Sequence, residues 1–218
     1  GVYTLKLTVN GQVYTRKLTV VNDPRVGQSA ALMAALRSQY RLTLLSYHGM
    51  ENSFEGHVEV QDVLSQLAKL MHGTLPPDVD TQAKALDKNL TKIGGAGPGP
   101  LDIMAMIRRM MAGPNTNEFK SFADENNDYN TMVSMMQVGI DMAPTPTQIA
   151  TWENDCGTYN RTVAAWKSAQ QQITDFNALL QKNQLPPLTL TPVKVTAEAS
   201  CSFGPAATRK ASKATTKR

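Results

Sequence analysis

The chain is poor in aromatic residues, and among its 218 residues it holds only three histidines and two cysteines. Aromatic residues make up 6% of the sequence, whereas eleven methionines suit a core built from leucine, methionine and alanine. No apolar run approaches the roughly 20 residues that a membrane-spanning helix needs. These shortages favour a mainly helical fold and argue against a membrane span.

Sequence motifs of catalysis are also missing. There is no GxSxG, HExxH or CxxC motif, and the glycine-rich stretch GGAGPGP lacks the Lys-Ser/Thr of a phosphate-binding loop. His48 and His57 stand nine residues apart, on opposite sides of a helix, so they cannot share a metal ion, and His72 falls at a helix end. We expect exposed or capping histidines, and we predict no catalytic, cofactor-binding or metal-binding residue in this chain.

The net charge of +4 comes from the last ten residues, which contain no acid. Without their five basic residues, 17 basic residues balance 18 acidic ones in the rest of the chain. A tail rich in Thr, Ala, Ser and Lys buries too little apolar surface to fold, so we expect residues 204–218 to be disordered. The tail is either a solvated end or a contact for an anionic polymer or surface, and nucleic acid is the disfavoured partner. Its basic residues are Arg209, Lys210, Lys213, Lys217 and Arg218.

The two cysteines, Cys156 and Cys201, leave two readings open. Neither stands in a spacing typical of zinc ligands. In an exported chain a disulfide between them would close a loop of about 45 residues and stabilise the fold by on the order of 4 kcal/mol. The alternative is two free or buried thiols.

Residues 1–22 are predicted to form a β-hairpin. Apolar and polar side chains alternate on both sides of Asn10-Gly11, a dipeptide that supplies the positive φ angles of a type I′ turn. Because a lone hairpin is marginal in water, we expect it to complete a sheet that begins upstream of residue 1, or to pack against the helices. Pro24 cannot continue a ladder, so residues 23–28 form the junction to the next domain.

Residues 29–184 are predicted to form an antiparallel, coiled-coil-like helix bundle with loops near 73–78, 94–100, 113–117 and 141–146. From Ser29, a candidate N-cap, one helix of roughly 40 residues follows, with Gly49 and Gly56 as candidate kink sites. We expect its apolar side chains to be used up in packing against other helices. One face of this helix carries Leu32, Leu36, Tyr40, Leu44 and Tyr47, and the pattern continues through Phe54, Val58, Val60, Val63, Leu64, Leu67 and Leu70.

A shorter helix is expected over residues 79–92. The methionine-rich stretch 101–113 suits helix packing, with an exposed groove for a partner helix as the alternative. Residues 185–203 are expected to be extended along the bundle or the hairpin.

The last two helices show the strongest periodicity, because their apolar positions alternate spacings of three and four. A short connection between them predicts antiparallel neighbours, and Thr145 with Gln148 predicts a capping box at the second helix. Trp152, Tyr159 and Trp166 form a stripe that is expected in the core rather than on a sugar-binding surface. The first seam is Phe119, Phe122, Asn126, Tyr129, Val133, Met136 and Ile140; the second is Ile149, Trp152, Cys156, Tyr159, Val163, Trp166, Gln170, Ile173 and Leu180.

Two acidic groups and two glycosylation sequons remain, and we expect all of them to be structural. The glutamates at positions 51, 55 and 59 follow an i, i+4 ladder that is typical of a solvated helix face. The acids at positions 124, 125 and 128 suit the N-terminal dipole of a helix that begins near Glu118. The sequons at Asn89 and Asn160 lie within helical patterns, which favours chance occurrence.

Four pieces of the sequence point to a known family. They are the hairpin start GVYTLKLTVNGQ, the strand end LTVVNDPRV, the helix start APTPTQ and the helix end LLQKNQLPPLTL, which together span residues 1 to about 190. In them the chain resembles the C-terminal region of bacterial sialidase-repeat (BNR) or sortilin-like β-propeller proteins, often labelled glycosyl hydrolases or WD40/YVTN/BNR-like repeat proteins. The methionine-rich stretch and the basic tail depart from that pattern.

The resemblance implies an exported protein of the periplasm, cell surface or medium. A propeller and an immunoglobulin-like β-sandwich would precede these helices, residues 1–22 would be the last hairpin of that sandwich, and any glycan or peptide site would lie on the propeller. No functional residue is carried over to this chain. We therefore expect a non-catalytic structural or interaction module that braces the upstream domains or self-associates. The alternatives are a binding module that uses the tail and a methionine-rich surface, and a glycoside hydrolase whose active site lies upstream.

Overall fold

The structure is a computed structural model, and it describes residues 1–21, 23, 29–95, 119–138, 142–191 and 195–204. It confirms a mainly helical fold with an N-terminal hairpin and a helix bundle. The elements are β1 (Val2–Val9), β2 (Gln12–Thr19), α1 (Ala30–Met71), α2 (Pro77–Gly94), α4 (Phe122–Val138) and α5 (Pro146–Lys182).

The hairpin has the predicted turn and register. Asn10 and Gly11 have φ angles of 47° and 79°, and β1 pairs antiparallel with β2 so that Val2 faces Thr19. Every residue of both strands is exposed, and within the described residues neither strand contacts a helix. The face that carries Tyr3, Leu5, Leu7, Tyr14 and Leu18, with Arg16 opposite Leu5, is therefore mostly apolar and uncovered.

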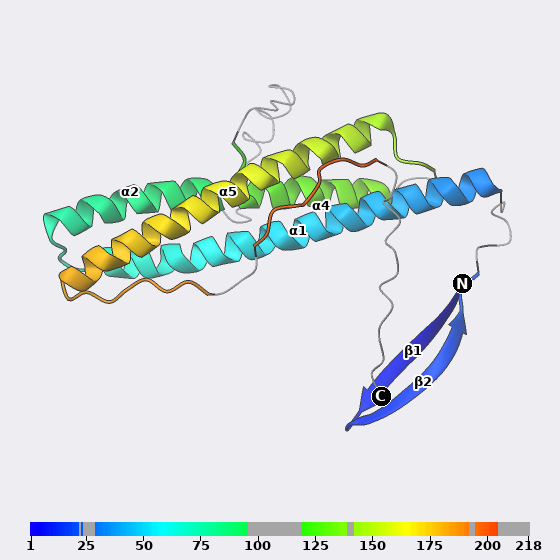
Figure 1. Cartoon of the computed structure of the whole chain (residues 1–218), viewed down its shortest axis with the longest axis horizontal. Coiled ribbons are helices and arrows are strands. Elements are labelled where there is room, and N and C mark those ends of the chain that lie inside the picture. Colours follow the sequence, from blue (N-terminus) through cyan, green and yellow to red (C-terminus); the bar gives the residue numbers. More distant parts are fainter. Residues whose placement is uncertain (22, 24–28, 96–118, 139–141, 192–194, 205–218) are drawn as a thin grey trace, which may run out of the picture.

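Within the described residues, the bundle contains two long helices and two shorter ones. Figure 1 shows α1 and α5 running along its length in the same direction, while α2 and α4 follow one another along it in the opposite direction. Gly95, which ends α2, lies against Ser121, which precedes α4. Each cross-section of the bundle therefore contains α1, α5 and either α2 or α4.

Around its middle, helix α1 packs through small residues, and here the predicted face was wrong, whereas Val60, Val63 and Leu67 are buried as predicted. The small buried positions are Ser46, Gly49, Ser53 and Gly56. A Cβ on Gly49 would lie 2.5 Å from Cζ of Tyr129, and one on Gly56 would lie 2.8 Å from the Phe122 ring. The glycines thus allow two aromatic rings to touch the α1 backbone, and α1 continues through both as one helix.

The helix starts follow their sequence signals. The Ser29 hydroxyl accepts a hydrogen bond from the Leu32 N–H at 3.1 Å. Thr145 and Gln148 form the predicted capping box, with bonds of 3.2 and 2.8 Å. Helix α4 begins at Phe122, later than predicted, because the Ser121 hydroxyl accepts from the Asp124 N–H at 3.2 Å.

The seams of α4 and α5 are largely buried in the core, as their spacing predicts. Asn126, the polar exception in α4, donates from Nδ2 to the Met50 carbonyl at 2.7 Å. The rings of Phe122 and Tyr129 each lie 6.3 Å from the Tyr159 ring. Ile140 falls outside the described residues. The buried seam residues are Phe122, Tyr129, Val133, Met136, Trp152, Cys156, Tyr159, Val163, Trp166, Ile173 and Leu180.

Candidate functional site

The most distinctive surface of the bundle is a row of exposed side chains on α1. Tyr40, Leu44, Tyr47, Phe54 and Val58 leave between 39% and 68% of their surface exposed. With Glu51 they occupy positions separated by 4, 3, 4, 3 and 4 residues, so they form one continuous stripe. We call these six residues the α1 seam. Our expectation that helix packing would use up these apolar side chains was wrong, because the small residues on the opposite face make the core contacts.

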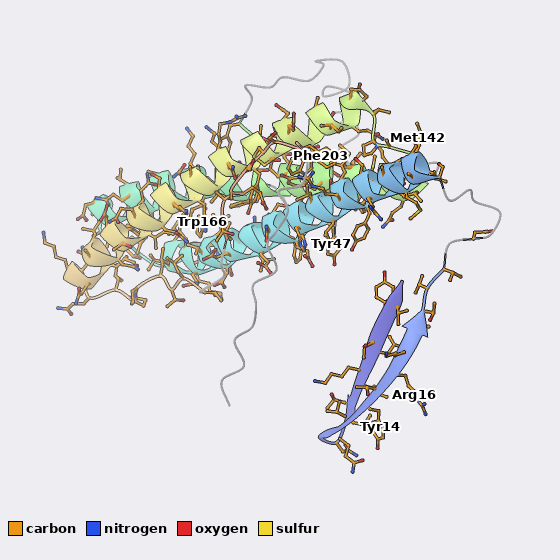
Figure 2. All side chains as sticks on the ribbon, turned by 45° about the vertical axis from the view of Figure 1, so that its right-hand side comes forward. Tyr14, Arg16, Tyr47, Met142, Trp166 and Phe203 are labelled. Carbon is orange, nitrogen blue, oxygen red and sulfur yellow. A yellow bond between two sulfur atoms is a disulfide. The ribbon has the colours of Figure 1, made fainter. Side chains whose placement is uncertain are left out.

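The centre of the α1 seam carries its polar groups. Glu51 Oε2 lies 3.3 Å from Nδ1 of His48, and both side chains are about half exposed. A hydrogen bond to Glu51 raises the pKa of Tyr47, and the charge of Glu51 adds to this effect. Figure 2 shows Tyr47 pointing away from the bundle, whereas Trp166 and Phe203 lie among the helices. The seam is therefore an apolar strip with one carboxylate and its partners in the middle.

A second notable cluster lies between α4 and α5. Nζ of Lys120 is 2.7 Å from a carboxylate oxygen of Asp128 and 2.9 Å from one of Asp155. Beside them, Glu125 is fully buried. A hollow of about 410 Å³ adjoins the cluster, with Met132, Met135 and Thr151 in its wall.

The charge states follow from burial and from the ion pairs. Burial works to lower the pKa of Lys120, but hydrogen bonds and charges from Asp128 and Asp155 outweigh it, so the pKa is raised. Burial raises the pKa of Glu125 to about 8, against a hydrogen bond with Thr158 and the charge of Lys120. It also raises the pKa of Asp155, although Lys120 opposes this. At neutral pH Lys120 is therefore an ammonium and Glu125 is mostly a neutral acid.

This chemistry suits a structural ion pair better than a reactive site. A lysine held as an ammonium is neither a nucleophile nor a base. Glu125, Asp128 and Asp155 place carboxylate oxygens within 4.8 Å of one another, a spacing that a metal ion can bridge. Because the Lys120 ammonium already bonds two of these three acids, we assign no metal to the cluster.

The buried Glu125 predicts a pH-dependent stability. Its pKa is about 8 in the folded chain and 4.5 ordinarily, so the folded state binds the proton more tightly. The contribution is complete below about 4.5 and is lost as the pH rises towards 8, with a slope of at most about 1.4 kcal/mol per pH unit. Urea denaturation across this range should show the free energy of unfolding falling more steeply for the natural chain than for Glu125→Gln.

The pH experiment has an expected residual slope and a matched control. The raised pKa of Asp155 leaves a residual slope of the same sign in Glu125→Gln. Glu55→Gln is the matched control, because Glu55 is exposed, and it should follow the natural chain. Equal slopes for all three proteins would show that Glu125 ionises freely in the folded state.

Several polar residues lie where the sequence did not place them. Glu59 is buried rather than solvated, and its Oε2 accepts a hydrogen bond from Trp166 Nε1 at 3.0 Å. Burial raises the pKa of Glu59, against that hydrogen bond. His57 is also buried, and its Nδ1 bonds the Gly94 carbonyl in the last turn of α2 at 2.8 Å. Only Glu51 and Glu55 of the predicted ladder face solvent, and Glu125 lies inside the bundle rather than at a solvated helix end.

The segment after α5 lies along the bundle and is tied to it. Cys156 and Cys201 form a disulfide. Phe203 is buried, with its ring 6.3 Å from that of Trp152 and 4.7 Å from the Arg41 guanidinium. Residues 183–204 therefore act as a strap across α1 and α5, apart from 192–194, which are not described.

Asparagine side chains hold the strap by pairing with its backbone. The Asn160 amide accepts from the Glu198 N–H at 2.7 Å and donates to the Glu198 carbonyl at 3.0 Å. Asn177 pairs with Leu188 in the same way, at 2.8 Å for each bond. Since Asn89 Nδ2 likewise donates to Gln172 at 2.8 Å, both sequon asparagines have structural partners.

Two predicted contact regions belong to parts of the chain that the structure does not describe. The basic residues Arg209 to Arg218 and the methionine-rich stretch 101–113 lie outside the described residues. Among the helices that the structure describes, none has a stretch long and apolar enough to cross a membrane. Comparison with known proteins found no matching family model, no matching curated protein and no matching solved structure. The resemblance to sialidase-repeat proteins therefore stays a prediction.

Proposed function

We propose that this chain is a non-catalytic interaction module, a helix bundle that presents the α1 seam for assembly. The observation that carries the proposal is the seam itself, with five large apolar side chains exposed in one continuous stripe. Contiguous exposed apolar surface of this kind marks interaction sites in soluble proteins. The charged cluster between α4 and α5 supports the non-catalytic reading, because its lysine is held in ion pairs with two of its acids.

The hairpin and the strap add to this proposal. A two-stranded hairpin with an uncovered apolar face needs further strands or a partner surface, which fits the last hairpin of an upstream β-sandwich. The disulfide fits an exported chain, because such bonds persist in oxidising compartments. We therefore propose an exported parent whose upstream domains this module braces or assembles, and whose glycoside hydrolase activity, if it has one, resides in those domains.

A stability comparison tests whether the α1 seam serves interaction or this chain's own fold. At dilute concentration, Tyr47→Ala and Phe54→Ala should each change the free energy of unfolding by less than about 0.5 kcal/mol, because both side chains are exposed. Phe122→Ala is the matched control, and it should cost about 3–5 kcal/mol because Phe122 is fully buried. The measurement is urea denaturation followed by circular dichroism.

The proposal fails if the seam variants cost as much as the control. That result would mean that Tyr47 and Phe54 are covered within the single chain and hold it together. The experiment needs no partner, so it judges the seam independently of what binds there.

A further inference from the structure

We infer that the α1 seam docks a second, antiparallel copy of this chain. The two-fold axis passes between Tyr47 and Glu51, at the level of Gly49 along the helix. This inference rests on the proposed function and names its partner. From Tyr40 to Val58 the seam rises by 18 residue steps, which is about 27 Å at 1.5 Å per residue. A stripe with spacings of 3 and 4 follows one side of a helix that coils around another, so a second helix is the partner that it fits over this length.

The order of the spacings allows an antiparallel pair as well as a parallel one. Read from either end, the seam has the same spacings of 4, 3, 4, 3 and 4. A reversed copy therefore matches every position, and the residue numbers of each facing pair add to 98. Tyr40 then faces Val58, Leu44 faces Phe54, and Tyr47 faces Glu51. Such a two-fold contact is closed, because each residue pair occurs twice and no further copy can add.

The polar centre of the seam supports the same register. In the antiparallel pair, each Glu51 meets the Tyr47 hydroxyl of the other copy while keeping its own Tyr47 and His48 as neighbours. A carboxylate accepts several hydrogen bonds, so its burial between the copies is compensated. In a parallel pair in register, Glu51 would instead face Glu51, and the repulsion of like charges would oppose association.

The size of the seam predicts a weak, reversible dimer. Five half-exposed side chains from each copy bury on the order of 1,000 Å² in total, near the lower end of specific interfaces. On α1, the flank of the seam that carries Arg41 is bordered by the strap, whose Phe203 carbonyl accepts a bond from Arg41 at 3.3 Å. The strap therefore shapes one edge of the interface, and association should depend on protein concentration.

Sedimentation equilibrium of the whole chain, from low-micromolar to near-millimolar concentration, tests the inference. The natural chain should shift from monomer to dimer across this range. Phe54→Glu should raise the dissociation constant at least about tenfold, because the two-fold axis places the substituted residue at two positions of the interface. Met135→Glu is the control, because Met135 is exposed on α4 outside the seam, and it should leave the dissociation constant unchanged.

Cysteine cross-linking under mild oxidation tests the direction. A mixture of the Tyr40→Cys and Val58→Cys chains should form cross-linked dimers, whereas either variant alone should not. Cross-linking of Tyr40→Cys with itself would show a parallel pair and overturn the inference.

A natural chain that stays monomeric at every concentration would also overturn it. So would protection of Phe54 that is independent of concentration and disappears when residues 1–20 are removed, since the chain's own hairpin would then be the occupant. A chain that stays monomeric leaves the stability comparison of the seam variants, and with it the proposed function, unaffected. The hairpin as occupant would instead make those variants lose stability, so the two failures can be told apart.

Discussion

Replacing Cys156 and Cys201 together by serine is expected to lower the free energy of unfolding by on the order of 4 kcal/mol. The disulfide joins residues 45 apart, and its removal returns the conformational freedom of that loop to the unfolded chain. Urea denaturation of the natural chain and of the double variant measures the loss. The strap should also loosen, which hydrogen exchange would detect at the Glu198 N–H, because this group donates to the Asn160 side chain of α5.

The control is reduction of the disulfide. A reducing agent should destabilise the natural chain by a similar amount and should leave the double variant unchanged. If the natural chain were equally stable oxidised and reduced, the asparagine pairs and Phe203 would hold the strap without help from the disulfide.

Gly49→Ala is expected to destabilise the chain by about 1–3 kcal/mol, although alanine is the better helix former. The added Cβ would lie 2.5 Å from the ring of Tyr129, which is fully buried and cannot move aside freely. Gly157→Ala is the matched control, since a Cβ at Gly157 in α5 would meet nothing within 4 Å. That variant should stabilise the chain by up to about 1 kcal/mol. Thermal and urea denaturation of both variants give the two signs.

If Gly49→Ala stabilised the chain as Gly157→Ala does, the close contact between α1 and α4 would be wrong. A second variant checks the mechanism. Adding Tyr129→Leu to Gly49→Ala should cost less than the sum of the two single changes, because a smaller side chain leaves room for the new methyl group.

The sequence predicted the helices and the buried Val60, Val63 and Leu67, but not which side of α1 is buried between Tyr40 and Val58. Helix starts at Ser29 and Thr145 were recognisable because capping depends on residues close together in the chain. For α1, the large apolar side chains formed the clearest stripe and were assigned to the core. The true contact face uses Gly49, Gly56 and small polar residues, which carry little hydrophobic signal but allow aromatic rings of α4 to approach.

The charged cluster could not be predicted from the sequence, because the fold assembles it from distant parts of the chain. Asp128 and Glu125 share a turn of α4, but their environment depends on Asp155, which α5 brings from a distant part of the chain. Lys120 precedes α4 and was not considered as their partner. Glu59 is a similar case. Its position in the glutamate ladder predicted an exposed side chain, but in the fold Trp166 of α5 lies against it.

The central claim is that α1 has one face in the core and another free for assembly. Hydroxyl-radical footprinting of the whole chain tests this claim most directly. In dilute solution, Tyr40 and Tyr47 should be modified and the buried Tyr129 and Tyr159 protected. Tyr47 should become protected as concentration rises. Modification of Tyr129 together with protection of Tyr47 at every dilution would contradict the account, since the seam would then be the core face of α1.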